Sequence, residues 1–248
     1  MTNPDELCQI LEWDSNFFGF PIARLNTRKL NQSNIHQVLY WCQANSVKCL
    51  YFLAASDGMD SIGVAEANGF HLVDLRITLE NQLNEKNGIK NVIPIEGLKI
   101  RTVIAEDILL LENIARCSYH LSRFYMDSNF PRKLCDDLYA TWIKQSCEGG
   151  SKMVLVADIN SKPVGYVTCD VAGENKGEGK IGLLGIDPEY RGLGIGLQLV
   201  DQALYWFKES HLENIKVVTQ GRNVQAIRLY QKCAFFLFSV DYWYHRWF

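Results

Sequence analysis

The spacing of apolar residues divides the chain into two α/β segments. In the first, residues 49–54 and 72–79 are apolar runs typical of strands, and residues 35–44 place their apolar side chains on one helical face. Residues 81–97 are polar, contain two glycines and a proline, and lack periodicity, which indicates a linker. We therefore predict a small N-terminal α/β domain over residues 1–90.

The second segment, residues 97–248, has a longer and more regular pattern. It predicts a strand, two helices, three strands, a helix, a strand, a helix and one or two aromatic terminal strands. The first strand covers residues 98–104, the first helix covers residues 106–117, and the second helix begins at Pro131. The three strands cover residues 153–159, 164–171 and 180–186, and the amphipathic helix follows residue 192. The last elements are a strand at 215–219, a helix at 223–232 and the terminal strands at 235–248. The turn at residues 160–163 joins the first two of the three strands into an antiparallel hairpin. The expected fold class is α/β, with a mixed, mostly antiparallel sheet flanked by helices.

Composition excludes several classes of function. The chain has 48% hydrophobic residues and a net charge of -3, which argues against a nucleic-acid-binding surface. Its N-terminus is acidic where a signal peptide is basic, and no run of 18 apolar residues occurs, so we expect a cytoplasmic protein without a membrane span. The eight cysteines form no C-x-x-C pair, so we expect buried, reduced thiols rather than a catalytic cysteine, and no metal site.

A glycine-rich run is the most informative motif. The strand at residues 180–186 ends in Asp187-Pro188, and the residues after it lead directly into a helix: Arg191, Gly192, Leu193, Gly194, Ile195 and Gly196. Glycines let the backbone approach a ligand, and the first amides of a helix point outward as anion donors. This pattern predicts a pyrophosphate cradle. The antiparallel surroundings argue against a dinucleotide fold, and Leu197 after Gly196 excludes a Walker loop.

A second motif spans residues 219–235. Asn223 is placed to cap a helix, and Tyr230 lies seven residues later on the same helical side, so it can face the same cleft. The alternative is a core tyrosine with a satisfied hydroxyl.

Together the two motifs resemble the GCN5-related N-acetyltransferases (GNAT), which implies a GNAT fold and acetyl-coenzyme A as co-substrate. The resemblance implies that the backbone of Leu184, Gly185 and Ile186 pairs with the pantetheine arm, and that the amides from Arg191 to Gly196, near Asn223, hold the pyrophosphate. It implies further that an amide near Gly185 or Ile186 polarises the acetyl carbonyl, and that Tyr230 protonates the departing thiolate. Ala234 stands where the family usually has glycine.

The base is not identified. Residues 181–186 carry no carboxylate, which leaves Asp170, Glu178 and ordered water as alternatives.

The acceptor is expected to be a small-molecule amine. Residues 11–25, 122–127 and 242–247 resemble the branch of the family that acetylates the 4-amino group of TDP-4-amino-4,6-dideoxygalactose. That resemblance and the donor fork of an arginine beside aromatic residues on a loop predict acceptor contacts from Arg123, Phe124, Tyr125 and Gln220. The structural alternatives are a strand end with a turn aspartate at Trp13-Asp14 and a solvated surface charge at Arg123.

Other functions stay open. They are acetylation of another amino sugar, an amino acid, an antibiotic or a protein, and coenzyme A binding without turnover. The oligomeric state is open between a monomer and a homodimer. A last hypothesis is that the N-terminal domain is a degenerate half-GNAT that contributes to the acceptor site, because residues 65–73 resemble residues 229–238.

Overall fold

A computed structural model describes residues 7–83, 94–171 and 177–248. Within these residues, ten strands form one mixed sheet in the order β1-β2-β3-β10-β4-β9-β8-β7-β6-β5. The strands are β1 (Cys8–Ile10), β2 (Ile22–Leu25), β3 (Cys49–Ala55), β4 (His71–Gln82), β5 (Leu98–Thr102), β6 (Met153–Ile159), β7 (Lys162–Val171), β8 (Glu178–Ile186), β9 (Asn214–Gln220) and β10 (Phe236–Trp247). The helices are α2 (Glu12–Phe18), α3 (Gln32–Ala44), α4 (Met59–Ala67), α5 (Ile108–Arg116), α6 (Arg123–Met126), α7 (Arg132–Gln145), α8 (Ile195–Glu209) and α9 (Val224–Lys232), with the short turns η1 (Ala105–Asp107), η2 (Ser146–Gly150) and η3 (Pro188–Tyr190).

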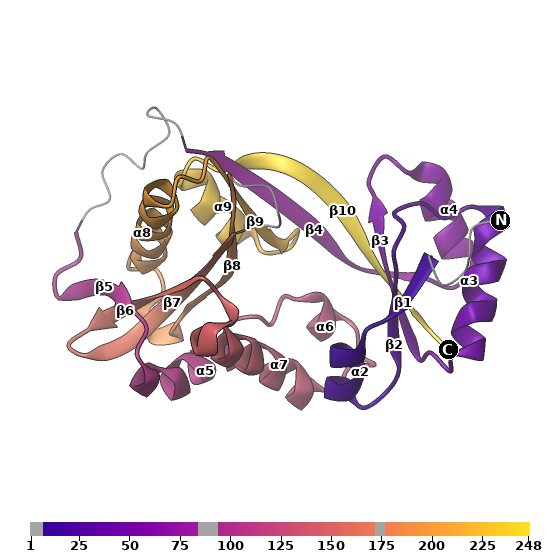
Figure 1. The fold of residues 1–248 in the computed structure, drawn as a ribbon, viewed down its shortest axis with the longest axis horizontal. Coiled ribbons are helices and arrows are strands. Elements are labelled where there is room, and N and C mark those ends of the chain that lie inside the picture. Colours follow the sequence, from indigo (N-terminus) through magenta and orange to yellow (C-terminus); the bar gives the residue numbers. More distant parts are fainter. Residues whose placement is uncertain (1–6, 84–93, 172–176) are drawn as a thin grey trace.

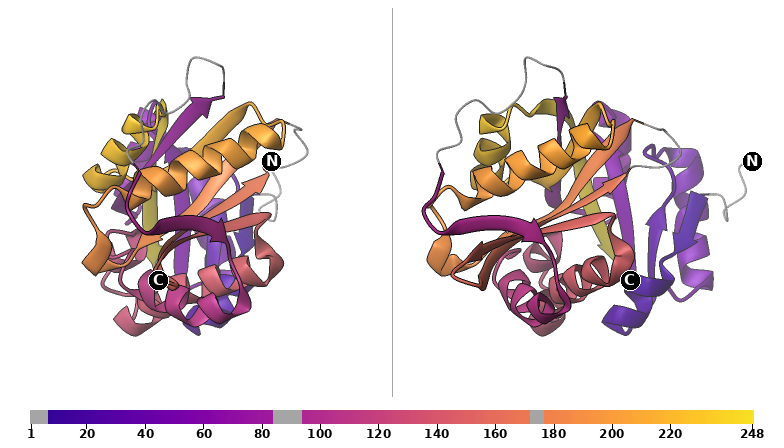
Figure 2. Two further views of the ribbon diagram at one scale, coloured as in Figure 1. Left: turned by 90° about the vertical axis from the view of Figure 1, so that its left-hand side faces the viewer. Right: turned by 60° about the vertical axis from the view of Figure 1, so that its left-hand side comes forward.

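The sheet is continuous across both sequence segments. The long strands β4 and β10 cross from one part of the molecule to the other, and β10 inserts between β3 and β4 (Figure 1). In the C-terminal part, α8 lies on one face of the sheet, and α5 and α7 cover the other (Figure 2). Separate apolar cores fill these two layers, and a third lies between β1 to β3 and helices α3 and α4. The division into two domains stays a prediction.

The expected fold class and the order of elements after residue 97 are confirmed, as are the strands at 49–54 and 72–79 and the helix at 35–44. Other expectations are wrong. Residues 12–18 form helix α2 instead of a strand end, and residues 123–126 form a helical turn instead of a loop. Of the one or two terminal strands expected, residues 236–247 form one. The linker cannot begin at residue 81, because β4 continues to Gln82. Residues 84–93 of that linker lie outside the described residues.

The sheet has an internal repeat of topology. Strands β1 and β2 are antiparallel, as are β7 and β8, while β2 and β3 are parallel, as are β8 and β9. Strand β3 then pairs with β10 antiparallel, and β9 pairs with β4 in the same way. Four strands of each half, β1 to β4 and β7 to β10, therefore share one arrangement, and the last strand of each set, β4 or β10, pairs with the strands of the other half.

The turns into β4 and β10 repeat in detail. The Phe70 amide donates to the Ala65 carbonyl at 3.1 Å, and the Phe235 amide donates to the Tyr230 carbonyl at 3.0 Å. Between them, Gly69 has φ +77° and Ala234 has φ +57°. In both turns, one residue in the left-handed region ends the helix and leads the chain into the next strand. Ala65 occupies the position in the first turn that Tyr230 occupies in the second.

Candidate functional site

Strands β8 and β9 separate towards their carboxyl ends. They pair only from Glu178 to Ile181 on β8, opposite residues 214–217 on β9. A bulge follows on β8, where the Leu183 amide donates to the hydroxyl of Thr168 at 2.8 Å. Beyond it, β8 pairs with β7 and β9 pairs with β4, so one side of β8 is left open to an extended ligand.

Backbone alternation decides which groups of β8 face this opening. The Asp187 amide donates to Val164 of β7 at 2.9 Å, and the Ile186 carbonyl accepts from Arg191 Nε at 3.1 Å on the other side. Successive residues of a strand direct their backbone groups to opposite sides. The amides of Leu184 and Ile186 therefore face the opening, and that of Gly185 faces β7.

Gly185 is required by the ring beside it. A Cβ atom at this position would lie 2.8 Å from the ring of Tyr166. The hydroxyl groups of Tyr166 and Tyr119 are 3.1 Å apart, and the ring of Tyr119 stacks on Tyr139 with centroids 4.2 Å apart. A cluster of three phenols, Tyr119, Tyr139 and Tyr166, therefore lies on the α5 and α7 face of the sheet, beside the opening.

The glycine loop has the conformation that its sequence demands. Gly192 and Gly194 have φ values of +80° and +89°, in the left-handed region that favours glycine. Gly194 is the N-cap of α8, so the amides just after it have no intrahelical acceptor and carry the positive end of the helix dipole. The Arg191 side chain fixes the loop by donating to the carbonyl groups of Ile186 and Cys117, the latter at 2.9 Å.

These elements enclose a groove of about 730 Å³. The predicted residues that line it are Leu184, Gly185, Ile186, Arg191, Gly192, Gly194, Ile195, Gly196 and Asn223. Leu193 does not line it and is 56% exposed. Sequence reasoning missed Arg228 and Lys232, one turn apart on α9. Together with Arg191 they give the lining three basic side chains, and no described lining residue is acidic. In a chain with a net charge of -3, this groove is suited to an anion.

Tyr230 is buried at the end of α9, next to the groove and not among its lining residues. Its ring meets that of Phe235 with centroids 5.6 Å apart. Burial raises the pKa of Tyr230 well above its usual range, so the phenol keeps its proton at neutral pH. The pKa of Tyr119 is also raised, by burial first, then by Tyr166 and by Tyr230. Asn223 caps α9 as expected, with its side chain accepting from the Ala226 amide at 3.1 Å.

The predicted acceptor residues occupy different environments from those expected. Phe124 and Tyr125 are buried in the core, where Tyr125 donates to Asp136, so neither offers a free stacking face. Arg123 is not a solvated charge, because three aromatic rings surround its guanidinium. Gln220 is the partly buried last residue of β9, and its carbonyl accepts from the Asn223 amide.

The carboxylates considered as bases are engaged elsewhere. Asp170 accepts from the Lys152 amide at 3.1 Å, and Glu178 pairs with Lys216 at 3.0 Å, both at the closed end of β8. A buried carboxylate that sequence reasoning missed is Asp74 on β4, 3.7 Å from Arg222. Burial raises the pKa of Asp74 to about 6, against the lowering effect of Arg222. Asp74 lies between two apolar residues, and this alternation is typical of a side chain that faces solvent. No local signal in the sequence could therefore have shown that Asp74 is buried.

The cysteines are mostly buried, as expected. Six are buried, Cys147 is partly buried, and Cys117 is exposed and lines the groove.

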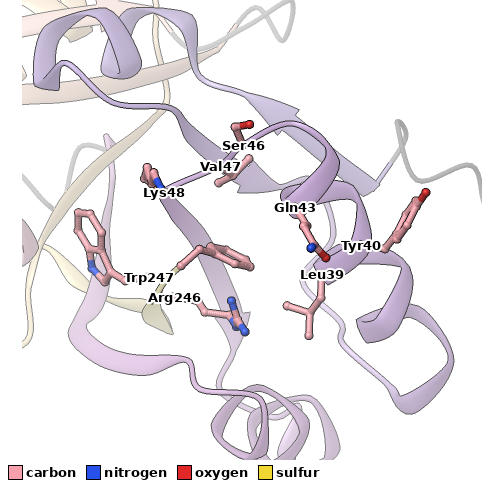
Figure 3. Close-up of a pocket in the computed structure, with 9 residues that line it drawn as sticks. Leu39, Tyr40, Gln43, Ser46, Val47, Lys48, Arg246 and Trp247 are labelled. Carbon is pink, nitrogen blue, oxygen red and sulfur yellow. The ribbon is translucent and has the colours of Figure 1, made fainter.

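A second hollow of about 670 Å³ lies between α3 and the end of β10. Figure 3 shows Tyr40 and Gln43 on one side of it and Arg246 and Trp247 on the other. None of the predicted site residues lines it. Among the described residues, no helix is long and apolar enough to cross a membrane.

Comparison with known proteins gives consistent matches. The model of the acetyltransferase (GNAT) family matches residues 114–235. The spore coat polysaccharide biosynthesis protein SpsD of Bacillus subtilis is 25% identical over 134 residues, which are 54% of this chain and 45% of SpsD, so the chain spans less than half of that relative. An uncharacterised N-acetyltransferase of Archaeoglobus fulgidus is 30% identical over 54% of this chain and 89% of its own length.

The fold is found in solved structures as well. A GCN5-related N-acetyltransferase from Sphaerobacter thermophilus superposes with a TM-score of 0.63 at 16% identity, over 97% of this chain and 76% of the other. With the family match over the groove and the relative matched over most of its length, the chain belongs to the GNAT acetyltransferase family.

Proposed function

We propose that this protein transfers the acetyl group of acetyl-coenzyme A directly to an amine. The observation that carries the proposal is the groove between β8 and α9, which combines Arg191, Arg228 and Lys232 with no acidic lining residue among those described. It lies at the N-terminus of α8, where free amides bind phosphate. Acetyl-coenzyme A, the acetyl donor of this family, carries phosphates at one end and a linear amide-containing arm at the other.

The residues fit the two parts of this molecule. Amides of the loop from Arg191 to Gly196 hold the pyrophosphate, and the two basic side chains of α9 add charge beside it. The open side of β8 offers backbone groups of Leu184 and Ile186 to the arm, like an added strand. Leu193, exposed and outside the groove, contributes only its backbone.

Acetyl-coenzyme A supplies an activated thioester, and the protein supplies polarisation and a proton. The Ile186 amide, which faces the opening, is the best placed donor for the acetyl oxygen. Transfer forms a carbon–nitrogen bond and breaks the carbon–sulfur bond. Tyr230 gives its proton to the sulfur, the amine loses its own proton to water, and Tyr230 regains a proton from water before the next turnover. The phenol of Tyr230 is protonated at neutral pH, as an acid must be before it gives up its proton.

The acceptor approaches from the face of the sheet that carries α5 to α7, where the phenol cluster lies. We propose a small amine, in particular the 4-amino group of a nucleotide-linked amino sugar. The name of SpsD, a polysaccharide biosynthesis protein, supports an acceptor of this class.

The repeat of topology supports the hypothesis that the N-terminal half is a degenerate half-GNAT. The described residues of that half lack the features of a donor site. The N-terminus of α3 is occupied by Asn31, whose side chain accepts from the amides of Ser33 and Asn34 at 3.0 and 2.9 Å. Residues 26–31 contain no glycine, and Ala65 stands in place of Tyr230. We propose that this half serves the acceptor side instead.

Mass spectrometry of the products tests the function. The protein is incubated with acetyl-coenzyme A and a panel of amines that holds TDP-4-amino-4,6-dideoxygalactose, free amino sugars, amino acids and a peptide. An acetylated nucleotide sugar supports the full proposal. Acetylation of another amine alone keeps the reaction and removes the sugar, and coenzyme binding without any product identifies a binding module.

A further inference from the structure

The guanidinium of Arg123 is held in an aromatic cage built from both halves of the chain. Its Cζ lies 4.1 Å from the ring centroid of Tyr51 on β3, 4.2 Å from that of Phe124 and 4.5 Å from that of Trp243 on β10. Arginine is more weakly hydrated than lysine and stacks on aromatic faces, so the cage stabilises this cation. The three rings pack against the guanidinium, whose N–H groups can act only as hydrogen-bond donors.

A relay of hydrogen bonds fixes the orientation of the guanidinium. Arg123 Nη1 lies 2.8 Å from His245 Nε2, and His245 Nδ1 lies 2.7 Å from Asp127 Oδ2. Arginine can only donate, so Nε2 must carry a lone pair and Nδ1 must donate to Asp127. The Trp247 indole donates to the same carboxylate oxygen at 2.8 Å.

The imidazole of His245, which contacts Arg123, is neutral. His245 is completely buried, and burial lowers its pKa to about 4, although Asp127 acts in the opposite direction. Hydrogen bonds from His245 and Trp247 lower the pKa of Asp127 to about 2, against the effect of burial. The carboxylate charge is therefore shared with His245 and Trp247, and it does not form a direct ion pair with Arg123.

The positive charge of Arg123 is thus left without a close counterion. In the part of the chain that the structure describes, no carboxylate lies within ion-pair distance of it. Asp14 and Asp74 feel its charge from further away, since Arg123 lowers the pKa of both against the raising effect of burial. The cage and His245 hold this partly buried cation in place without neutralising it, so its charge is available to an anionic ligand.

The location of Arg123 suits the acceptor. Trp243, which stacks on Arg123, is the cross-strand partner of Asp74. Phe124, which also stacks on Arg123, packs against Trp142 with ring centroids 6.4 Å apart, and Trp142 packs against Tyr139 of the phenol cluster with centroids 5.1 Å apart. The caged arginine and the phenols beside the opening therefore border the same region.

From this geometry we infer that Arg123 binds an anionic group of the acceptor, a phosphate or a carboxylate, and that His245 and Asp127 are positioning residues for it. Both anions accept two parallel N–H bonds from a guanidinium. The inference rests on the proposed function only in calling this ligand the acceptor.

Direct titration tests anion binding by Arg123 separately from acetyl transfer. Thymidine diphosphate, which cannot be acetylated, is titrated by calorimetry into the parent protein, Arg123→Met and Arg123→Lys. Methionine keeps most of the packing and removes the charge, whereas lysine keeps the charge and loses the planar guanidinium with its parallel N–H donors. Loss of a charge-assisted pair predicts affinity about 10- to 100-fold weaker for methionine, with a smaller loss for lysine. Arg116→Ala, which breaks a surface pair with Asp137, is the control and should bind as the parent does.

Kinetics extend the test to carboxylates and to the relay. With an amine acceptor that carries a phosphate or carboxylate, Arg123→Met and His245→Asn should raise KM about 10-fold or more and leave kcat nearly unchanged. With an uncharged amino sugar, KM should stay the same. Equal effects on charged and uncharged acceptors, together with equal binding of thymidine diphosphate, would overturn the inference while acetyl transfer stands. Arginine-dependent binding of thymidine diphosphate without any acetyl transfer would keep the anion site and remove the proposed function.

Discussion

Ala65 and Tyr230 occupy equivalent positions in two repeated turns, each with its carbonyl accepting from the amide of a phenylalanine five residues later, Phe70 or Phe235. The equivalence extends to the strands that flank the turns. Only the C-terminal turn carries a phenol, and only the C-terminal half has a glycine loop before its long helix. The chain therefore combines two copies of one topology with one proposed donor site.

One acetyl-coenzyme A should accordingly bind per chain. Calorimetric titration is expected to give a stoichiometry of one, and Gly194→Val should abolish or strongly weaken binding, because a β-branched residue is strained at φ +89° and crowds the phosphate cradle. Gly63→Ala is the control, since a methyl group there meets nothing within 4 Å. A stoichiometry of two, or unchanged affinity in Gly194→Val, would contradict this assignment.

The two left-handed turn residues offer a reciprocal test of the repeat. Ala234→Gly should raise the free energy of unfolding and Gly69→Ala should lower it, each by about 1 kcal/mol, because a side chain in the left-handed region is strained. Urea unfolding at 25 °C measures both changes. Changes of the same sign in the two variants would show that the turns are not energetically equivalent.

Direct transfer predicts that no cysteine carries the acetyl group. Cys117 is the critical case, because it is exposed and lines the groove. Cys117→Ser should keep the parent rate of acetyl transfer, and intact-mass spectrometry of the parent protein after mixing with acetyl-coenzyme A should detect no acetylated protein. A trapped acetyl thioester together with an inactive serine variant would replace direct transfer by a covalent mechanism.

Burial of neutral His245 makes stability depend on pH. The histidine has a pKa of about 4 in the folded protein and about 6.5 unfolded, so between these values the unfolded chain binds the extra proton. Acidification from pH 7 to pH 5 should cost the parent about 2 kcal/mol from this group. Asp127, with its pKa lowered to about 2, loses its contribution only at lower pH.

The free energy of unfolding is measured for the parent and for His245→Gln at pH 7 and pH 5. The loss between the two pH values is then compared for the two proteins. The variant should lose less stability on acidification than the parent, even if it is less stable at pH 7. Equal losses in the two proteins would contradict a buried neutral imidazole.

The C-terminal half could be predicted from the sequence because its signals are local. Amphipathic spacing marks α8, and the glycine loop and the Asn223 cap act through neighbouring backbone groups. Helix α2 has weaker local signals. It is secured by the Ser15 hydroxyl, which accepts from the Ile22 amide at 2.9 Å, and by packing of Trp13 near Trp142.

The surroundings of Arg123 could not be predicted, because its contacts join distant residues. Arg123 and His245 are 122 positions apart, and His245 and Asp127 are 118 apart. The aromatic residues next to Arg123 in sequence suggested stacking surfaces for a ligand, yet Tyr125 is buried in the core. These groups come together because β10 inserts between β3 and β4. The sequence of a single strand does not show which strands it will pair with.

The most direct test of the central claim is the rate of thiol release from acetyl-coenzyme A by Tyr230→Phe, measured with an accepted amine alongside calorimetric affinity for acetyl-coenzyme A. The phenol is buried and protonated, so its removal should lower turnover about 10²-fold and leave the affinity nearly unchanged. Equal turnover in the variant and the parent would contradict the role of Tyr230 as the acid that completes acetyl transfer.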